Sequence, residues 1–126
     1  MKKLALILAL SMTVLVVSAQ NSKVNSAITY SKDPYFELDK AKVAIDTAVV
    51  HVKTMNSAKA WKVRGDVYYA IAKSTDDKYK SLCENPLEVA IESYKKALAL
   101  DKKGDFKAEI QLEFMQISGK LYNNAI

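Results

Sequence analysis

The sequence predicts an all-α protein, and three observations support this fold class. From residue 36 onward, apolar side chains recur three or four residues apart, which is the period of an amphipathic helix. Two stretches, 58–72 and 86–101, place small residues between aromatic ones, which lets two helices pack closely. The three glycines are isolated, and the two prolines fall where helices are expected to begin.

The first 19 residues have the pattern of a signal peptide. Lys2 and Lys3 form a basic start, an apolar run follows, and Val17-Ser18-Ala19 supplies small residues for cleavage before Gln20. An uncleaved anchor is the alternative, although the apolar run is near the short limit for crossing a bilayer. We expect removal of residues 1–19, no membrane span afterwards, and a periplasmic or secreted protein. Its net charge would be +3, two fewer than the +5 of the whole chain.

Two helices are expected next, a short one over 25–30 and a strong one over 36–52. The sequence Ser31-Lys32-Asp33-Pro34 separates them, because the residue before a proline disfavours helix. Asp33 would be the N-cap if the second helix begins at Pro34. The apolar face of that helix is formed by residues at helical spacing: Leu38, Ala41, Ile45, Ala48, Val49 and Val52.

The central pair of helices is predicted over 58–72 and 86–101. Asn56 or Ser57 can cap the first of them. The second begins with a strong signal, in which Asn85 is the N-cap, Pro86 is the first helical residue and Glu88 completes a capping box. Between the two helices, residues 73–84 form an irregular segment that packs on the core through three side chains: Tyr79, Leu82 and Cys83.

The last helix is expected from Phe106 to the end of the chain, with Gly104 in a left-handed conformation before it and Asp105 as its cap. It carries two apolar stripes, one with Ile110, Phe114, Ile117 and Leu121, the other with Leu112, Met115, Gly119 and Tyr122. One hairpin cannot bury both stripes. We expect the stripe of Phe114, Ile117 and Leu121 to be exposed. It would then drive self-association, or a further helix of a longer chain would cover it.

Within 58–101, six residues keep a recognisable spacing: Trp61, Gly65, Tyr68, Ala90, Tyr94 and Ala97. They match the signature W-x2-L-G-x2-Y and A-x3-F, so this segment resembles the tetratricopeptide repeat family. Arg64 stands in place of the leucine, Lys102 stands in place of the closing proline, and about 13 residues are inserted between the helices. Trp61 is expected to be buried between the two helices, so Trp61→Ala would cost roughly 3–5 kcal/mol.

The resemblance implies αα-hairpins stacked in a short right-handed solenoid, as in an exported bacterial member of the family. Ala41, Ile45 and Ala48 fit the second helix of an earlier repeat. In the last helix, Met115 and Gly119 have the spacing expected for the first helix of a further repeat. The second helix of that repeat does not follow in this sequence. We therefore expect a single domain over 20–126 that is incomplete at its C-terminus.

By the same resemblance, the protein is expected to be a scaffold or adaptor that binds a protein or peptide on a concave surface. The concave positions would be Lys59, Lys62, Asp66, Tyr69, Glu113, Gln116, Lys120, Asn123 and Asn124. The alternative is a structural subunit of a cell-envelope assembly that docks through its last helix. Mass distinguishes the two, because an adaptor would exist as a monomer that captures peptides and a subunit only within a complex.

No residue pattern in the sequence indicates catalysis, a metal or a cofactor. His51 and Cys83 are the only histidine and cysteine, and neither lies in a signature of a nucleophilic enzyme or supplies a four-ligand zinc site. Asp76 and Asp77 lack the ligand spacing of a calcium loop. Export and the modest charge also argue against nucleic acid as a partner. We therefore expect no enzymatic activity.

Overall fold

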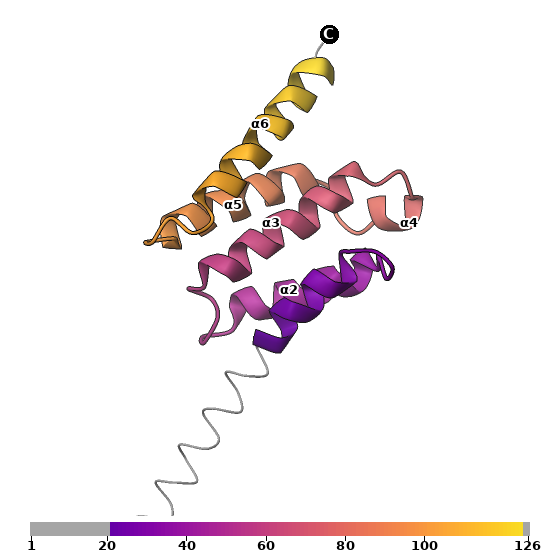
Figure 1. The fold of residues 1–126 in the computed structure, drawn as a ribbon. Helices are drawn as coiled ribbons and strands as arrows, with labels where there is room; N and C mark the ends of the chain where they lie inside the picture. The colour runs from indigo at the N-terminus through magenta and orange to yellow at the C-terminus, as the bar shows by residue number, and fades with distance from the viewer. Residues whose placement is uncertain (1–20, 125–126) are drawn as a thin grey trace, which may run out of the picture.

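The computed structural model describes residues 21–124, and this part of the chain is all-α, as predicted (Figure 1). A helical segment spans residues 21–30. It is followed by α2 (Leu38–Val50), α3 (Ala58–Lys73), α4 (Asp77–Lys80), α5 (Pro86–Leu100) and α6 (Lys107–Asn124). The predicted signal peptide lies outside the described residues.

Helix α3 is the centre of the structure. It lies between α2 on one side and α5 on the other, and α6 follows beyond α5 (Figure 1). Its buried side chains meet those of both neighbours, because residues from α2, α3 and α5 form one core with Val24 and Ala27 of the first segment. Burial on two opposite sides leaves only a narrow strip of α3 facing solvent.

The close contact between α3 and α5 is made at Gly65. A Cβ atom placed on Gly65 would lie 2.5 Å from the ring of Tyr94, which is far inside van der Waals contact. Tyr94 is fully buried, and Ala90 and Ala97 beside it on α5 are fully buried too. The small residue on α3 therefore receives the aromatic ring of α5, and the close packing of the two helices that the sequence predicted is present.

Arg64 joins three helices. Its Nε lies 3.1 Å from Asp46 Oδ1 of α2, and its Nη1 donates a hydrogen bond of 3.0 Å to Ser93 Oγ of α5. The Tyr68 hydroxyl donates to the other oxygen of Asp46 at 2.7 Å, and Lys42 approaches that oxygen at 3.1 Å. These groups are partly or fully buried, and their mutual hydrogen bonds offset the free-energy cost of burying polar atoms.

Several predicted helix ends are corrected in the N-terminal half. The first helical segment is longer than the predicted 25–30, and α2 begins at Leu38, so neither Asp33 nor Pro34 starts it. The chain instead turns after residue 30, and Phe36 adopts a positive φ of 40°. Helix α2 ends at Val50, and Val52 is 72% exposed rather than part of the apolar face.

The inserted segment between α3 and α5 packs on the core as predicted. Asp76 caps α4, because its carboxylate accepts a hydrogen bond from the Lys78 amide at 2.9 Å. Tyr79 is buried, and its hydroxyl donates to the Phe36 carbonyl at 2.8 Å. The insertion therefore supports the turn that follows the first segment.

The predicted helix caps have mixed outcomes. Ser57 caps α3 by accepting from the Ala60 amide at 3.3 Å, and Pro86 is the first residue of α5. Asn85 occupies the N-cap position without a side-chain hydrogen bond. The Asp105 prediction is wrong, because Asp101 accepts hydrogen bonds from the backbone amides before α6. Gly104 does adopt a positive φ of 76°.

Trp61 is only partly buried, so the prediction of full burial is wrong. Its Nε1 donates to the Met55 carbonyl at 2.7 Å, which holds the indole toward the loop before α3. The guanidinium of Arg64 and the ammonium of Lys96 lie over the ring, 5.7 Å and 6.0 Å from it. We therefore expect Trp61→Ala to cost less than the roughly 3–5 kcal/mol of a fully buried aromatic.

Helix α6 buries most of the stripe that was predicted to be exposed, and of that stripe only Leu121, which is 50% exposed, agrees with the prediction. Ile110 and Ile117 are buried, and Phe114 packs edge-on against Tyr94 with ring centroids 5.9 Å apart. The exposed stripe contains Leu112 and Met115, which are 55% and 71% exposed. The stripe that contains the buried residues is the more apolar of the two, because the other includes Gly119 and Tyr122.

Candidate functional site

A groove with a volume of about 480 Å³ runs along the solvent-facing strip of α3. One wall comes from the first segment and its turn, the other from α6, and the C-terminal end is closed by Ser74. The floor belongs to α3 and to Tyr94 of α5. Four parts of the chain therefore contribute to one hollow.

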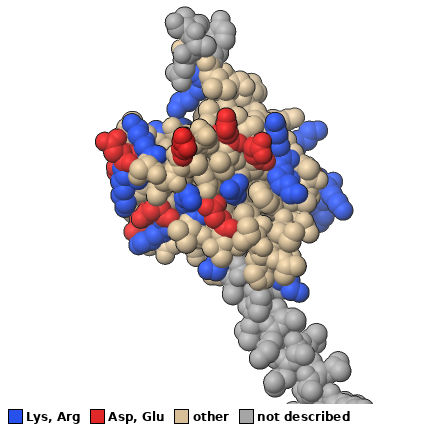
Figure 2. Space-filling view, turned by 180° about the vertical axis from the view of Figure 1, so that it is seen from behind, with Lys and Arg blue, Asp and Glu red and all other residues tan. Residues whose placement is uncertain are grey.

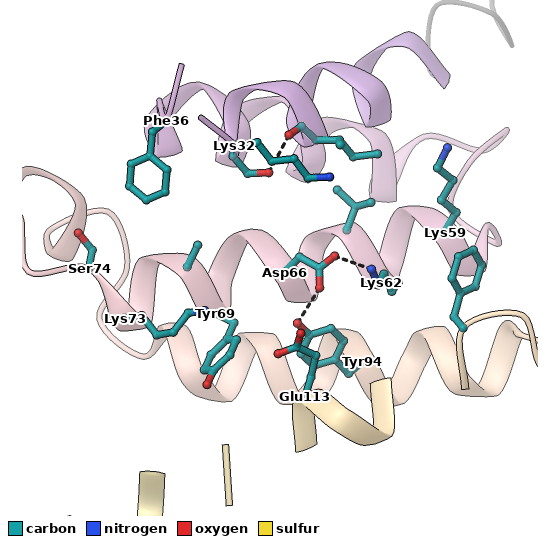
Figure 3. A pocket seen from close by; sticks show the side chains of 15 residues that line it. Lys32, Phe36, Lys59, Lys62, Asp66, Tyr69, Lys73, Ser74, Tyr94 and Glu113 are labelled. Atoms are coloured by element: carbon teal, nitrogen blue, oxygen red, sulfur yellow. Dashed lines mark hydrogen bonds and ion pairs between the residues drawn. The ribbon is translucent and has the colours of Figure 1, made fainter. Parts of the chain in front are cut away.

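The α3 residues in the groove form a single helical stripe. Lys59, Lys62, Asp66, Tyr69 and Lys73 follow one another at intervals of three or four residues, so their side chains leave the same face of the helix. Figure 3 shows Lys59 at one end, Lys73 and Ser74 at the other, and Lys62 with Asp66 between them. The stripe extends over most of the length of α3.

The structure brings together five of the nine predicted concave residues. Lys59, Lys62, Asp66, Tyr69 and Glu113 line the groove. Three others are exposed on α6 without lining it: Gln116, Lys120 and Asn123. They lie farther along α6, whose C-terminal half projects beyond the other helices (Figure 1). The side chain of Asn124 lies outside the described part.

Sequence reasoning missed several groove residues. Lys73 continues the α3 stripe by one more turn and could have been found by extending the helix from residue 72 to 73. Lys32, Phe36 and Phe106 come from turns beside the helices. No periodic signal marks them, because their places depend on how the turns fold back over α3.

The middle of the groove holds a cluster of ion-paired side chains. Lys62 Nζ lies 3.0 Å from Asp66 Oδ2 and 2.7 Å from Glu109 Oε2. The Tyr94 hydroxyl donates to Asp66 Oδ1 at 2.8 Å. The single cation of Lys62 thus faces two carboxylates, one of which is also held by a buried hydroxyl.

These contacts change the protonation of the groups involved. Burial of the Lys62 ammonium opposes its charge, but its hydrogen bonds to Glu109 and Asp66 outweigh burial and raise the pKa of Lys62. The hydrogen bond from Lys62 lowers the pKa of Glu109. Burial, together with the negative charge of Asp66, strongly raises the pKa of Tyr94. These contacts therefore favour a charged ammonium at Lys62, an ionised carboxylate at Glu109 and a neutral phenol at Tyr94.

The lysines at the two ends of the groove differ from Lys62 in their exposure and ion pairing. Lys59 and Lys73 are exposed, and neither has an ion-pair partner among residues 21–124. Lys73 Nζ lies 4.2 Å from the centroid of the Tyr69 ring, a cation–π contact that holds it over the groove. Elsewhere charge is mixed, and Figure 2 shows acidic and basic side chains interspersed over one face.

His51 and Cys83, the two residues considered for catalysis, make contacts within the fold. His51 follows α2, and its Nδ1 accepts from the Lys53 amide at 3.2 Å. Cys83 is a half-buried free thiol packed on the core before α5. Within residues 21–124, no three or more potential ligands are grouped as a metal ion would need. None of the helices in this range is long and apolar enough to cross a membrane.

Comparison with known proteins gave no match, whether to family models, to curated proteins or to solved structures.

Proposed function

We propose that the protein is an exported, non-catalytic interaction module of the tetratricopeptide type, which holds an extended segment of a partner protein in the groove along α3. In this proposal the first segment with α2, α3 with α5, and α6 are successive helical pairs of a short right-handed solenoid, the last of them incomplete. The spacing of Trp61, Gly65 and Tyr68 and the Gly65–Tyr94 contact support it.

The observation that carries the proposal is the composition of the groove walls. The groove is lined by the first segment, α3 and α6, which are the first helices of the three proposed pairs. In stacked helical repeats, the concave surface made by one helix of each pair is the surface that binds partners. An elongated groove with an aromatic floor and charged rims suits an extended peptide better than a compact small molecule.

Peptide display followed by photo-cross-linking tests the proposal. Peptides selected on the immobilised protein would be offered to variants that carry a photoreactive amino acid at Ser74, which lines the groove, or at Lys95, which is exposed on α5 outside it. We expect cross-links from Ser74 and none from Lys95, because only the first position faces the bound peptide.

Two results would contradict this function. Selection could yield no peptide that binds in solution, or the selected peptides could cross-link equally from both positions. Circular dichroism of both variants serves as the control, because a helical spectrum equal to that of the unmodified protein shows that each variant is folded.

A second candidate function is supported by the exposed face of α6. Leu112 and Met115 are 55% and 71% exposed, which is unusual for large apolar residues that neighbour one another on a helix. This favours a structural subunit of a cell-envelope assembly that docks through α6. Size-exclusion chromatography of native extracts distinguishes the candidates, because a subunit would elute only in a large complex.

A further inference from the structure

Charge along the groove is not uniform, and its distribution specifies a ligand. The groove has a lysine without an ion pair at each end, Lys59 and Lys73, and an ion-paired lysine, Lys62, in the middle. Figure 3 shows this order from one side of the view to the other. A ligand that follows the groove therefore meets a cation, then a region in which carboxylates outnumber ammonium groups, then a second cation.

The middle of the groove disfavours an acidic side chain. Lys62 already faces Asp66 and Glu109, and Glu113 also lines this part of the groove. Lys32 is on the opposite wall and acts on Glu109, whose pKa it helps to lower. The two lysines are thus opposed by three carboxylates. A ligand carboxylate placed here would be repelled, whereas an apolar side chain would avoid this repulsion and meet the partly exposed Ala70.

The ends of the groove favour acidic side chains. Lys59 and Lys73 are 14 positions apart on one straight helix, which separates their backbones by about 21 Å at 1.5 Å per residue. An extended peptide covers this length with about six residues at roughly 3.3 Å each. Both ammonium groups lack an ion-pair partner among the described residues, so each can pair with a carboxylate.

From this geometry we infer that the groove recognises an extended peptide segment that is acidic at both ends and apolar over the four or so residues between them. The inference rests on the proposed function, since it specifies the ligand of the same groove. The apolar floor and the length between the cations select a peptide over a compact anion, which would contact one lysine only.

Three labelled peptides of about eight residues test the inference by fluorescence anisotropy. The acid-ended peptide has acidic residues at both ends and apolar ones in the centre. The acid-centred peptide has the same composition with the acids in the middle, and the lysine-ended peptide replaces the acids by lysines. We expect the acid-ended peptide to bind about tenfold more tightly than the acid-centred one, with weaker binding at high salt, and the lysine-ended peptide not to bind.

Charge reversal assigns the effect to the two lysines. Lys59→Glu and Lys73→Glu should each weaken binding of the acid-ended peptide by about fivefold, whereas Lys95→Glu, an exposed lysine of α5 outside the groove, should change it by less than about twofold. All three lysines are exposed, so these variants should keep the thermal midpoint of the parent, which circular dichroism checks.

The inference is overturned if the acid-centred peptide binds as well as the acid-ended one, or if the reversals at Lys59 and Lys73 have no more effect than Lys95→Glu. In either case the proposed function survives as long as peptides still cross-link from Ser74. Failure of every peptide, including displayed ones, to cross-link from Ser74 would instead reject the proposed function itself.

Discussion

Gly65 is the residue on which the packing of α3 against α5 depends most directly. The ring of Tyr94 occupies the space where a Cβ atom would lie, and this ring is fully buried with its hydroxyl bound to Asp66. Neither the ring nor the helix axis can move without breaking other contacts. A methyl group at this position must therefore separate the helices.

A matched pair of glycine substitutions tests this contact. Gly65→Ala should lower the free energy of unfolding by about 1–3 kcal/mol, because overpacking outweighs the better helix propensity of alanine. Gly119→Ala should raise it by up to about 1 kcal/mol, because nothing lies within 4 Å of its added Cβ. Urea denaturation of both variants provides the values. An equal gain in stability for both would show that Gly65 is not a point of close approach.

The buried phenol of Tyr94 makes stability depend on pH in the alkaline range. A tyrosine in an unfolded chain ionises near pH 10, whereas burial and Asp66 raise the pKa of Tyr94 well above that. Above about pH 10 the unfolded state therefore binds fewer protons than the folded state, and the free energy of unfolding falls as pH rises. The raised pKa values of Lys42 and Lys62 act in the same direction.

Tyr94→Phe isolates the contribution of this residue. The variant keeps the ring against Gly65 and removes the ionisable hydroxyl, so the fall in stability between about pH 9 and 11 should be shallower than in the parent. Urea denaturation followed by circular dichroism at a series of pH values measures it. Identical slopes for the two proteins would mean that Tyr94 ionises in the folded state as easily as in the unfolded one.

Helix α6 is the element with an incomplete set of neighbours. Its inner stripe meets α5, while Leu112 and Met115 face solvent and Gly119 has open space beside it. In α3, the glycine at the corresponding position receives Tyr94, so the two helices share a sequence pattern but not an environment. An exposed apolar face of this kind favours association.

We expect the protein to self-associate through this face of α6 at high concentration. Met115→Lys should convert it to a monomer in sedimentation velocity measurements without lowering the thermal midpoint, because Met115 is 71% exposed. Asn25→Lys is the control, since it adds the same charge at an exposed position of the first helical segment, outside α6. A parent protein that stays monomeric at all concentrations would contradict the expectation.

At the scale of the whole molecule, the groove exists because α3 is covered on two sides and open on a third. The first segment folds back after residue 30, and α4 supports this turn through the hydrogen bond from Tyr79 to Phe36. The loop before α6 sets the opposite wall, where Asp101 binds the amides of Asp105 and Phe106 at 3.0 Å and 2.9 Å. Two irregular connections therefore determine the width of the site.

By itself, the sequence determined the helical class, the positions of the longer helices and the close packing of 58–72 against 86–101. These features depend on local periodicity and on residue size, which a sequence displays directly. It also marked four lysine, acid and tyrosine positions of α3 that line the groove: Lys59, Lys62, Asp66 and Tyr69.

Only the tertiary structure decided the start of α2, the exposed stripe of α6 and the partial exposure of Trp61. It also placed Lys32 and Phe36 in the groove and paired Lys62 with Glu109 across two helices. The physical reason is that these features depend on the direction in which turns deliver one helix to another. The burial of an apolar stripe and the ion pairing of a lysine are set only once the neighbouring helices are in place.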